Sequence, residues 1–160
     1  MAVDIKQAYR RLIEEAFGKG NLDVFDEVCD SSFRSHDPVT GDADLKQEKE
    51  NCRGYRVAFP DLKPTILRSW VDADGDTCIV HWRMNGTHQG ALMGTAPTGR
   101  RCAAEGISVG SFRAGKLVEE WVQWDALGLM RQIGAGTTAE AGAQGARPQQ
   151  GTQTQTQSKH

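Results

Sequence analysis

The spacing of apolar residues changes once along this chain, at about residue 60, and this change constrains the fold more than any other feature. Before it, apolar residues recur every three to four positions and predict helices over residues 5–17, about 22–28 and 44–59. After it, β-branched and aromatic residues form runs between turn signals, predicting strands over residues 65–71, 77–92, 101–112 and 117–124. A last short helix is predicted over residues 126–133. Helices followed by hairpin-connected strands favour an α+β domain with an antiparallel sheet.

Capping residues set the predicted helix boundaries. Asp4 and Asp44 each stand before a helix with a glutamine three residues later, the spacing of an N-cap and its partner. Asn21 is the candidate cap of the second helix. His36 is predicted to lie in a loop after the second helix, and the pair Glu119 and Glu120 is interpreted as solvent-facing strand.

The charge and composition exclude several classes of partner. The formal net charge is −2 and no basic stretch occurs, so nucleic acid and anionic membranes are not expected partners. No apolar run reaches the ~20 residues of a membrane span, and the N-terminus lacks the apolar core of a signal peptide. Four cysteines without a C-x-x-C pair predict reduced thiols and a cytoplasmic protein. Residues 135–160 lack aromatic and large aliphatic side chains, which predicts a disordered tail after one domain over residues 1–134.

Common catalytic and metal-binding motifs are absent from the sequence. No H-x-H, H-E-x-x-H or C-x-x-C spacing suggests a metal site, and no nucleophile elbow suggests a catalytic serine. The glycines at 86, 90 and 94 lie in a strand region and not at a strand–helix turn, so they do not predict a phosphate loop. The motifs therefore predict no metal site, no nucleophilic serine and no phosphate loop.

Ordered motifs in the second half of the chain resemble one known family. Gly86-Thr87-His88-Gln89-Gly90 is followed by residues 94–100, and Gly115-Lys116-Leu117-Val118-Glu119-Glu120-Trp121 continues through Trp124-Asp125 to residue 134. Together with residues 33–38 and 59–61, this set is similar to the SnoaL-like polyketide cyclases, or ester cyclases, over about residues 5–134. The resemblance implies the cone-shaped fold of nuclear transport factor 2, in which a curved, mostly antiparallel sheet packs on three N-terminal helices around one deep pocket. It also implies cofactor-independent, intramolecular aldol-type ring closure or isomerisation of a small carbonyl compound.

The resemblance assigns the principal catalytic role to Asp125, which matches the acid/base aspartate of the cyclases. Asp125 also directly precedes the last predicted helix, so capping that helix is an alternative role. His36, His88 and His81 are the candidates to steady an enolate. The cyclases pair their aspartate with a histidine on the preceding strand, whereas residues 101–113 contain none.

Other residues are candidates for substrate binding: Tyr9, Tyr55, Trp82, Arg83, Glu105 and Trp121. Arg83 paired with Glu105 would be the kind of set with which epoxide hydrolases of this fold activate water, so a hydrolase is one alternative. A non-catalytic protein that binds a small hydrophobic ligand is another. Strand 77–92 is apolar on both faces, which predicts that the outer face of the sheet is covered, as in a homodimer.

Overall fold

The computed structural model describes residues 3–135, which form helices packed on a six-stranded sheet. The predicted tail over 135–160 lies outside this range apart from Ala135. The elements in chain order are α1 (Ile5–Arg11), the π-helix η1 (Leu12–Phe17), α2 (Asp23–Val28), β1 (Cys29–Asp37), β2 (Gly41–Asp44), α3 (Leu45–Ala58), β3 (Lys63–Val71), β4 (Thr77–Thr87), β5 (Arg101–Arg113), β6 (Lys116–Trp124) and α4 (Ala126–Ile133).

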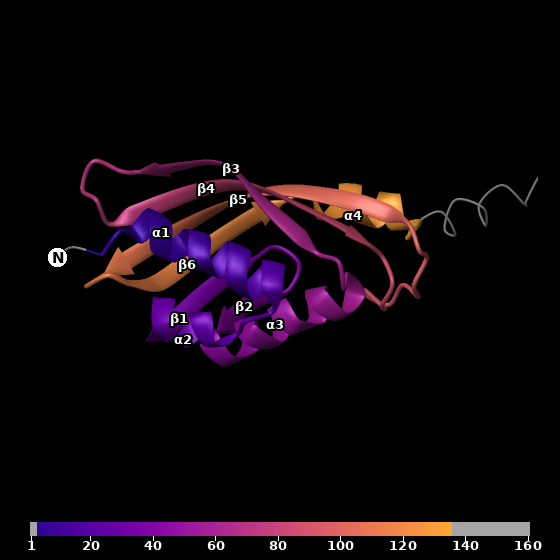
Figure 1. Ribbon diagram of the computed structural model, residues 1–160, viewed down its shortest axis with the longest axis horizontal. Coiled ribbons are helices and arrows are strands. Elements are labelled where there is room, and N and C mark those ends of the chain that lie inside the picture. The colour runs from indigo at the N-terminus through magenta and orange to yellow at the C-terminus, as the bar shows by residue number, and fades with distance from the viewer. Residues whose placement is uncertain (1–2, 136–160) are drawn as a thin grey trace, which may run out of the picture.

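The sheet has the strand order β2-β1-β6-β5-β4-β3. All neighbouring strands are antiparallel except β1 and β6, which pair in parallel. In Figure 1 the long strands β4 and β5 curve over α1, while α2 and α3 lie beside β1 and β2. The expected α+β fold with a curved, mostly antiparallel sheet is therefore confirmed.

Three aspartates cap helices where the sequence places them. Asp4 accepts a hydrogen bond from the Gln7 amide, Asp44 from the Gln47 amide at 2.8 Å, and Asp125 from the Gly128 amide at 2.8 Å. Such side chains satisfy backbone N–H groups that have no partner within the helix. These local contacts fix the starts of α1, α3 and α4.

Two local predictions were wrong. His36 belongs to strand β1 and not to a loop, because it pairs with Asp42 of β2 and with Trp121 of β6. Strand β4 ends at Thr87 and not near residue 92. The chain turns away there because the amides of Gln89 and Gly90 both donate to the Ala58 carbonyl at the end of α3.

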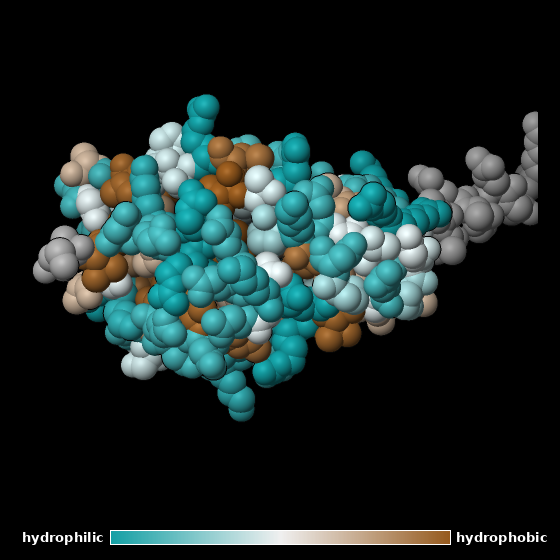
Figure 2. Space-filling view, in the orientation of Figure 1, coloured by the Kyte–Doolittle hydropathy of each residue, from teal (hydrophilic) through white to brown (hydrophobic). Residues whose placement is uncertain are grey.

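The core lies between the helices and the inner face of the sheet. A large cluster joins α1, η1 and α2 to β1 and β4–β6, and a smaller one joins the ends of α3 and α4. Hydrophilic side chains cover most of the face seen in Figure 2, where hydrophobic groups form separate small patches. Within residues 3–135, no helix is long and apolar enough to cross a membrane.

Candidate active site

A pocket with about 980 Å³ of empty space, its open mouth included, lies between the helices and the inner face of β4–β6. Helices η1 and α3 form one side, and inward-facing residues of the strands form the other. Its walls carry eight aromatic side chains: Tyr9, Phe17, Phe25, Phe33, Tyr55, Phe59, Trp82 and Trp124. A mostly apolar cavity with a few polar groups is the usual form of a small-molecule site.

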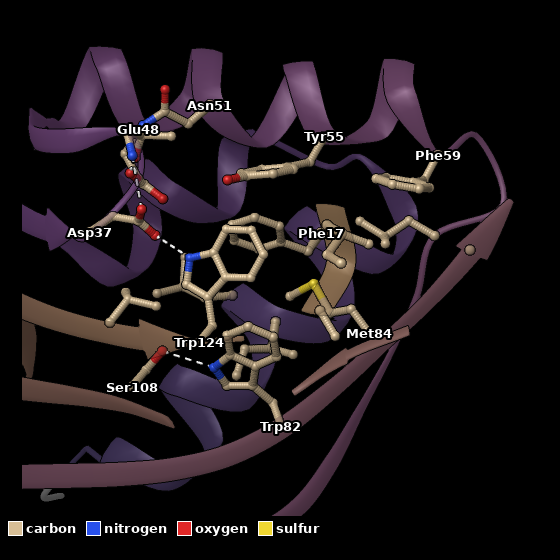
Figure 3. A pocket seen from close by; sticks show the side chains of 18 of the residues that line it. Phe17, Asp37, Glu48, Asn51, Tyr55, Phe59, Trp82, Met84, Ser108 and Trp124 are labelled. Carbon is tan, nitrogen blue, oxygen red and sulfur yellow. Dashed lines mark hydrogen bonds between the residues drawn. The ribbon is translucent and has the colours of Figure 1, made fainter. Parts of the chain in front are cut away.

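Two indole rings at the floor of the pocket are held in fixed orientations (Figure 3). Trp82 donates from Nε1 to the Ser108 hydroxyl at 3.0 Å, and Trp124 donates from Nε1 to Asp37 Oδ2 at 2.9 Å. Gly106 on β5 leaves room for both rings, since a Cβ there would lie 2.7 Å from the Trp124 Cβ and clash with the Trp82 ring. The lack of a side chain at this strand position therefore opens the floor of the pocket.

Three carboxyl groups supply most of the polarity of the pocket: Asp37 of β1, Glu48 of α3 and Glu120 of β6. No lysine, arginine or histidine is among the described residues that line it. Asp37 accepts hydrogen bonds from the amides of Val39 and Thr40 at 2.7 and 2.9 Å, besides the Trp124 bond. Glu48 accepts one from Asn51 Nδ2 at 3.2 Å.

Among the carboxyl groups of the pocket, Glu120 has a pKa far above its ordinary value. Burial, followed by the charge of Glu48, raises its pKa to about 7, while a hydrogen bond donated by the Tyr9 hydroxyl opposes this rise. Burial likewise raises the pKa of Glu48, with the charge of Asp37 adding to the effect. A carboxyl group with a pKa near neutrality can both take and return a proton.

Tyr55 presents a free hydrogen-bonding group to this pocket. Its hydroxyl is buried without a hydrogen-bond partner among the described residues, and burial raises the pKa of the phenol. The ring meets that of Trp124 edge to face, with centroids 6.2 Å apart, and its oxygen is directed toward the side of Glu48 and Asp37 in Figure 3. A buried hydroxyl of this kind can donate to an oxygen of a bound ligand.

Of the residues that the sequence suggested for binding or catalysis, three line the pocket: Tyr9, Tyr55 and Trp82. Asp125 does not line it and instead caps α4. It borders a second, open depression together with Arg83 and Glu105. Arg83 and Glu105 form an ion pair through Arg83 Nε at 2.7 Å. Arg83 is next to inward-facing Trp82 on β4, and Glu105 is next to inward-facing Gly106 on β5. Because successive side chains of a strand point to opposite faces, this ion pair lies on the outer face of the sheet.

The three histidines also lie outside the pocket lining. His36 bonds to Asp42 at 2.8 Å and to Glu119 at 3.0 Å, and stacks on Trp121 with ring centroids 4.9 Å apart. His81 lies 3.3 Å from Glu105 on the outer face.

His88 is fully buried in the segment that follows β4. Its Nδ1 lies 3.0 Å from the Thr98 hydroxyl, and its ring lies against Phe59 with centroids 5.7 Å apart. The structure therefore does not bring the histidines together with Asp125.

The interpretation of Glu120 as solvent-facing was wrong, because its carboxyl group points into the pocket and bonds to buried Tyr9. The signal was present in β6, where Glu120 alternates with the inward-facing Val122 and Trp124. Sequence reasoning also missed Asp37, Glu48 and Asn51 as pocket residues. Their meeting depends on the packing of α3 over β1 and leaves no local pattern.

Comparison with known proteins finds one family and many similar structures. The family model described as SnoaL-like polyketide cyclase matches residues 7–133. A protein from Jannaschia sp. CCS1, provisionally named a SnoaL-like polyketide cyclase, is 24% identical over 82% of this chain and 92% of its own, with a TM-score of 0.75. IdmH from Streptomyces antibioticus, a provisional polyketide cyclase, is 24% identical over 82% and 99% of the two chains, with a TM-score of 0.72.

A third structure, from Acidithiobacillus ferrooxidans and also provisionally named a polyketide cyclase, is 26% identical. It covers 83% of this chain and 97% of its own, with a TM-score of 0.70. No curated protein matches the chain.

Proposed function

This chain belongs to the SnoaL-like polyketide cyclase family, and we propose that its pocket closes a ring in, or isomerises, a small polyketide-like carbonyl compound. The catalysis is general acid–base catalysis supplied by the side chains of the pocket. One observation carries the proposal: the Glu120 carboxyl group, with a pKa of about 7, faces an aromatic cavity. The four cysteines are buried and free, which suits a reducing compartment, and we place the reaction in the cytoplasm.

Glu120 is the general base in this proposal. A carbon between two carbonyl groups is acidic enough for one well-placed carboxylate to remove its proton, and the protonated acid then returns a proton to the product. Tyr9 holds the carboxyl group in place, and the free Tyr55 hydroxyl donates to the enolate oxygen. The aromatic walls exclude water and hold the substrate in a folded, reactive conformation.

Asp125 stays the alternative base that the family resemblance suggests, and the two carboxyl groups are separable by mutation. The epoxide hydrolase alternative finds no support in the main pocket, because Arg83 and Glu105 pair on the outer face of the sheet. A non-catalytic ligand-binding protein would have the same pocket, so turnover is the observation that decides between these functions.

The pH dependence of turnover tests the proposal. For an aromatic polyketide ester that can cyclise, we expect kcat/KM of the wild type to rise about tenfold per pH unit below pH 7 and to level off above it. The reason is that only ionised Glu120 can take the proton. The measurement is a steady-state rate profile, with small epoxides as the comparison substrates.

The Asp125→Asn variant is the control for this profile. If Glu120 is the base, Asp125→Asn keeps the profile and loses at most about 1 kcal/mol of stability, because asparagine also caps helices well. If turnover is lost in Asp125→Asn, the general base is Asp125 and not Glu120. Turnover of epoxides, or binding without turnover, contradicts the proposed reaction.

We also propose a homodimer formed through the outer face of the sheet. Trp70, Ile107 and Trp121 on this face are 42%, 45% and 43% exposed, and large apolar groups gathered on one face are typical of an interaction surface. An isologous two-fold interface would cover this face in both subunits.

Light scattering after size-exclusion chromatography is expected to give the mass of two chains. Ile107→Glu is expected to weaken the dimer at least about tenfold, because it places a charge at the centre of an apolar interface. Its far-UV circular dichroism should match that of the wild type. A monomeric wild type contradicts the dimer.

A further inference from the structure

We propose that the ligand of the pocket carries a basic nitrogen, bound as an ammonium ion between the carboxyl groups of Asp37 and Glu48 and the surrounding aromatic rings. The inference rests on the proposed function in one respect, since it concerns the ligand of the same pocket. It adds the charge of that ligand, which the family does not specify.

In the part of the chain that the structure describes, the pocket is lined by acidic groups without basic ones. Its lining holds three carboxyl groups and no basic side chain among the described residues. Two basic residues of α3 bond to groups other than these carboxylates: Lys49 to Asp26 at 2.6 Å, and Arg56 to the carbonyls of Phe17 and Gly18 at 2.7 and 2.8 Å. Negative charge in a cavity of low polarity attracts a cation far more strongly than in water. A bound cation would supply the counter-ion that the ionised forms of these carboxyl groups lack in the described lining, whereas an anion would be repelled.

The aromatic walls suit a cation as well as a hydrophobic ligand. Tyr55 and Trp124 meet edge to face beside the two carboxyl groups, so the faces of their rings form a corner (Figure 3). An ammonium ion over such faces gains a cation–π attraction that is largest where water is excluded. The free hydroxyl of Tyr55 remains to bond the carbonyl oxygen of the same ligand.

An inorganic cation fits the site less well than an organic one. Within residues 3–135, no group of three or more histidine, cysteine or acidic residues is arranged to hold a metal ion. A pocket with eight aromatic residues in its walls also has far more apolar surface than a metal ion can use. The arrangement fits a ligand with an apolar body and one positive nitrogen.

Two matched compounds test the inference without any turnover. Phenyltrimethylammonium and tert-butylbenzene have nearly the same shape, but only the first carries a charge. We expect the ammonium compound to bind at least about tenfold more tightly, measured by quenching of the Trp82 and Trp124 fluorescence or by calorimetry. Its affinity should also increase from about pH 6 to about pH 8, because Glu120 becomes ionised over that range.

Variants of helix α3 provide the matched control. Glu48→Gln is expected to lower the affinity for phenyltrimethylammonium at least about fivefold and to leave that for tert-butylbenzene within about twofold. Glu50→Gln, two residues away and paired with Arg53 at the surface, should change neither affinity. Unchanged thermal unfolding of Glu48→Gln shows that the fold is intact, and Asp37→Asn serves as the second variant if Glu48→Gln fails to fold.

Equal affinities for the two compounds, or no saturable binding of the ammonium compound, would overturn the inference. Neither result affects the proposed reaction, which is judged by turnover of a carbonyl substrate. Conversely, a protein that binds the ammonium compound with the expected dependence on Glu48, yet turns nothing over, retains this ligand class and loses the proposed catalysis.

Discussion

Glu120→Gln is expected to lower kcat at least about a hundredfold, the usual contribution of a positioned general base. Glutamine has the same shape and can still accept the hydrogen bond from Tyr9, but it cannot take a proton. The matched control is Glu119→Gln, because Glu119 is the adjacent residue on the opposite face of β6 and bonds to His36. Its kcat should stay within about twofold of the wild type in the same steady-state assay.

The same substitution has a second measurable effect, on stability. The pKa of Glu120 is about 7 in the folded protein and near the ordinary 4.5 in the unfolded chain. Between these values the folded state binds more protons, so the wild type loses stability as the pH rises from about 4.5 to about 7, by about 3 kcal/mol in total. Glu120→Gln lacks this loss and should be the more stable protein at about pH 8 in urea unfolding. A stability difference between the two proteins that does not change with pH contradicts the raised pKa.

Gly90→Ala is expected to destabilise the fold by about 3 kcal/mol or more. A Cβ at this position would lie 2.8 Å from the Val57 carbonyl carbon and 3.0 Å from the Ala58 Cα. These are backbone atoms at the end of α3 and cannot move aside as a flexible side chain could. The clash would also separate the Gly90 amide from the Ala58 carbonyl, to which it donates at 3.0 Å. Urea unfolding measures the loss.

Gly54→Ala is the control for this prediction. Gly54 lies within α3, and a Cβ there would meet nothing within 4 Å. Alanine should therefore stabilise the protein by about 1 kcal/mol through its higher helix propensity. A Gly90→Ala variant as stable as the wild type would show that the contact between this loop and α3 is loose.

The elements that the sequence predicted well are those whose signals are local. The periodicity of the helices and the aspartates at positions 4, 44 and 125 report contacts within a few residues. Strand β1 has the polar sequence CDSSFRSHD, which lacks a β-branched run. It is a strand because β2 and β6 flank it, and β6 comes from the other end of the domain.

The residues of the candidate site also divide into those with a local sequence signal and those without one. Tyr9, Tyr55 and Trp82 were suggested by residue type and periodicity, and they lie on the pocket wall. Glu120 could have been placed by its alternation with Val122 and Trp124. Asp37 and Glu48 could not, because one lies on a strand and the other on a helix, and tertiary packing alone brings them together.

The parallel pairing of β1 with β6 has a consequence for the order in which the chain can fold. Partners such as Arg34 and Glu119 are far apart in sequence, so closing this pair costs much chain entropy before any contact compensates for it. On the ribosome, β1 has only the short strand β2 beside it in the sheet until β6, almost the last element of the domain, has been made. The other edge of β1 stays unpaired during that time, and the arrival of β6 is therefore expected to set both the folding rate and the period in which the nascent chain is most exposed to aggregation.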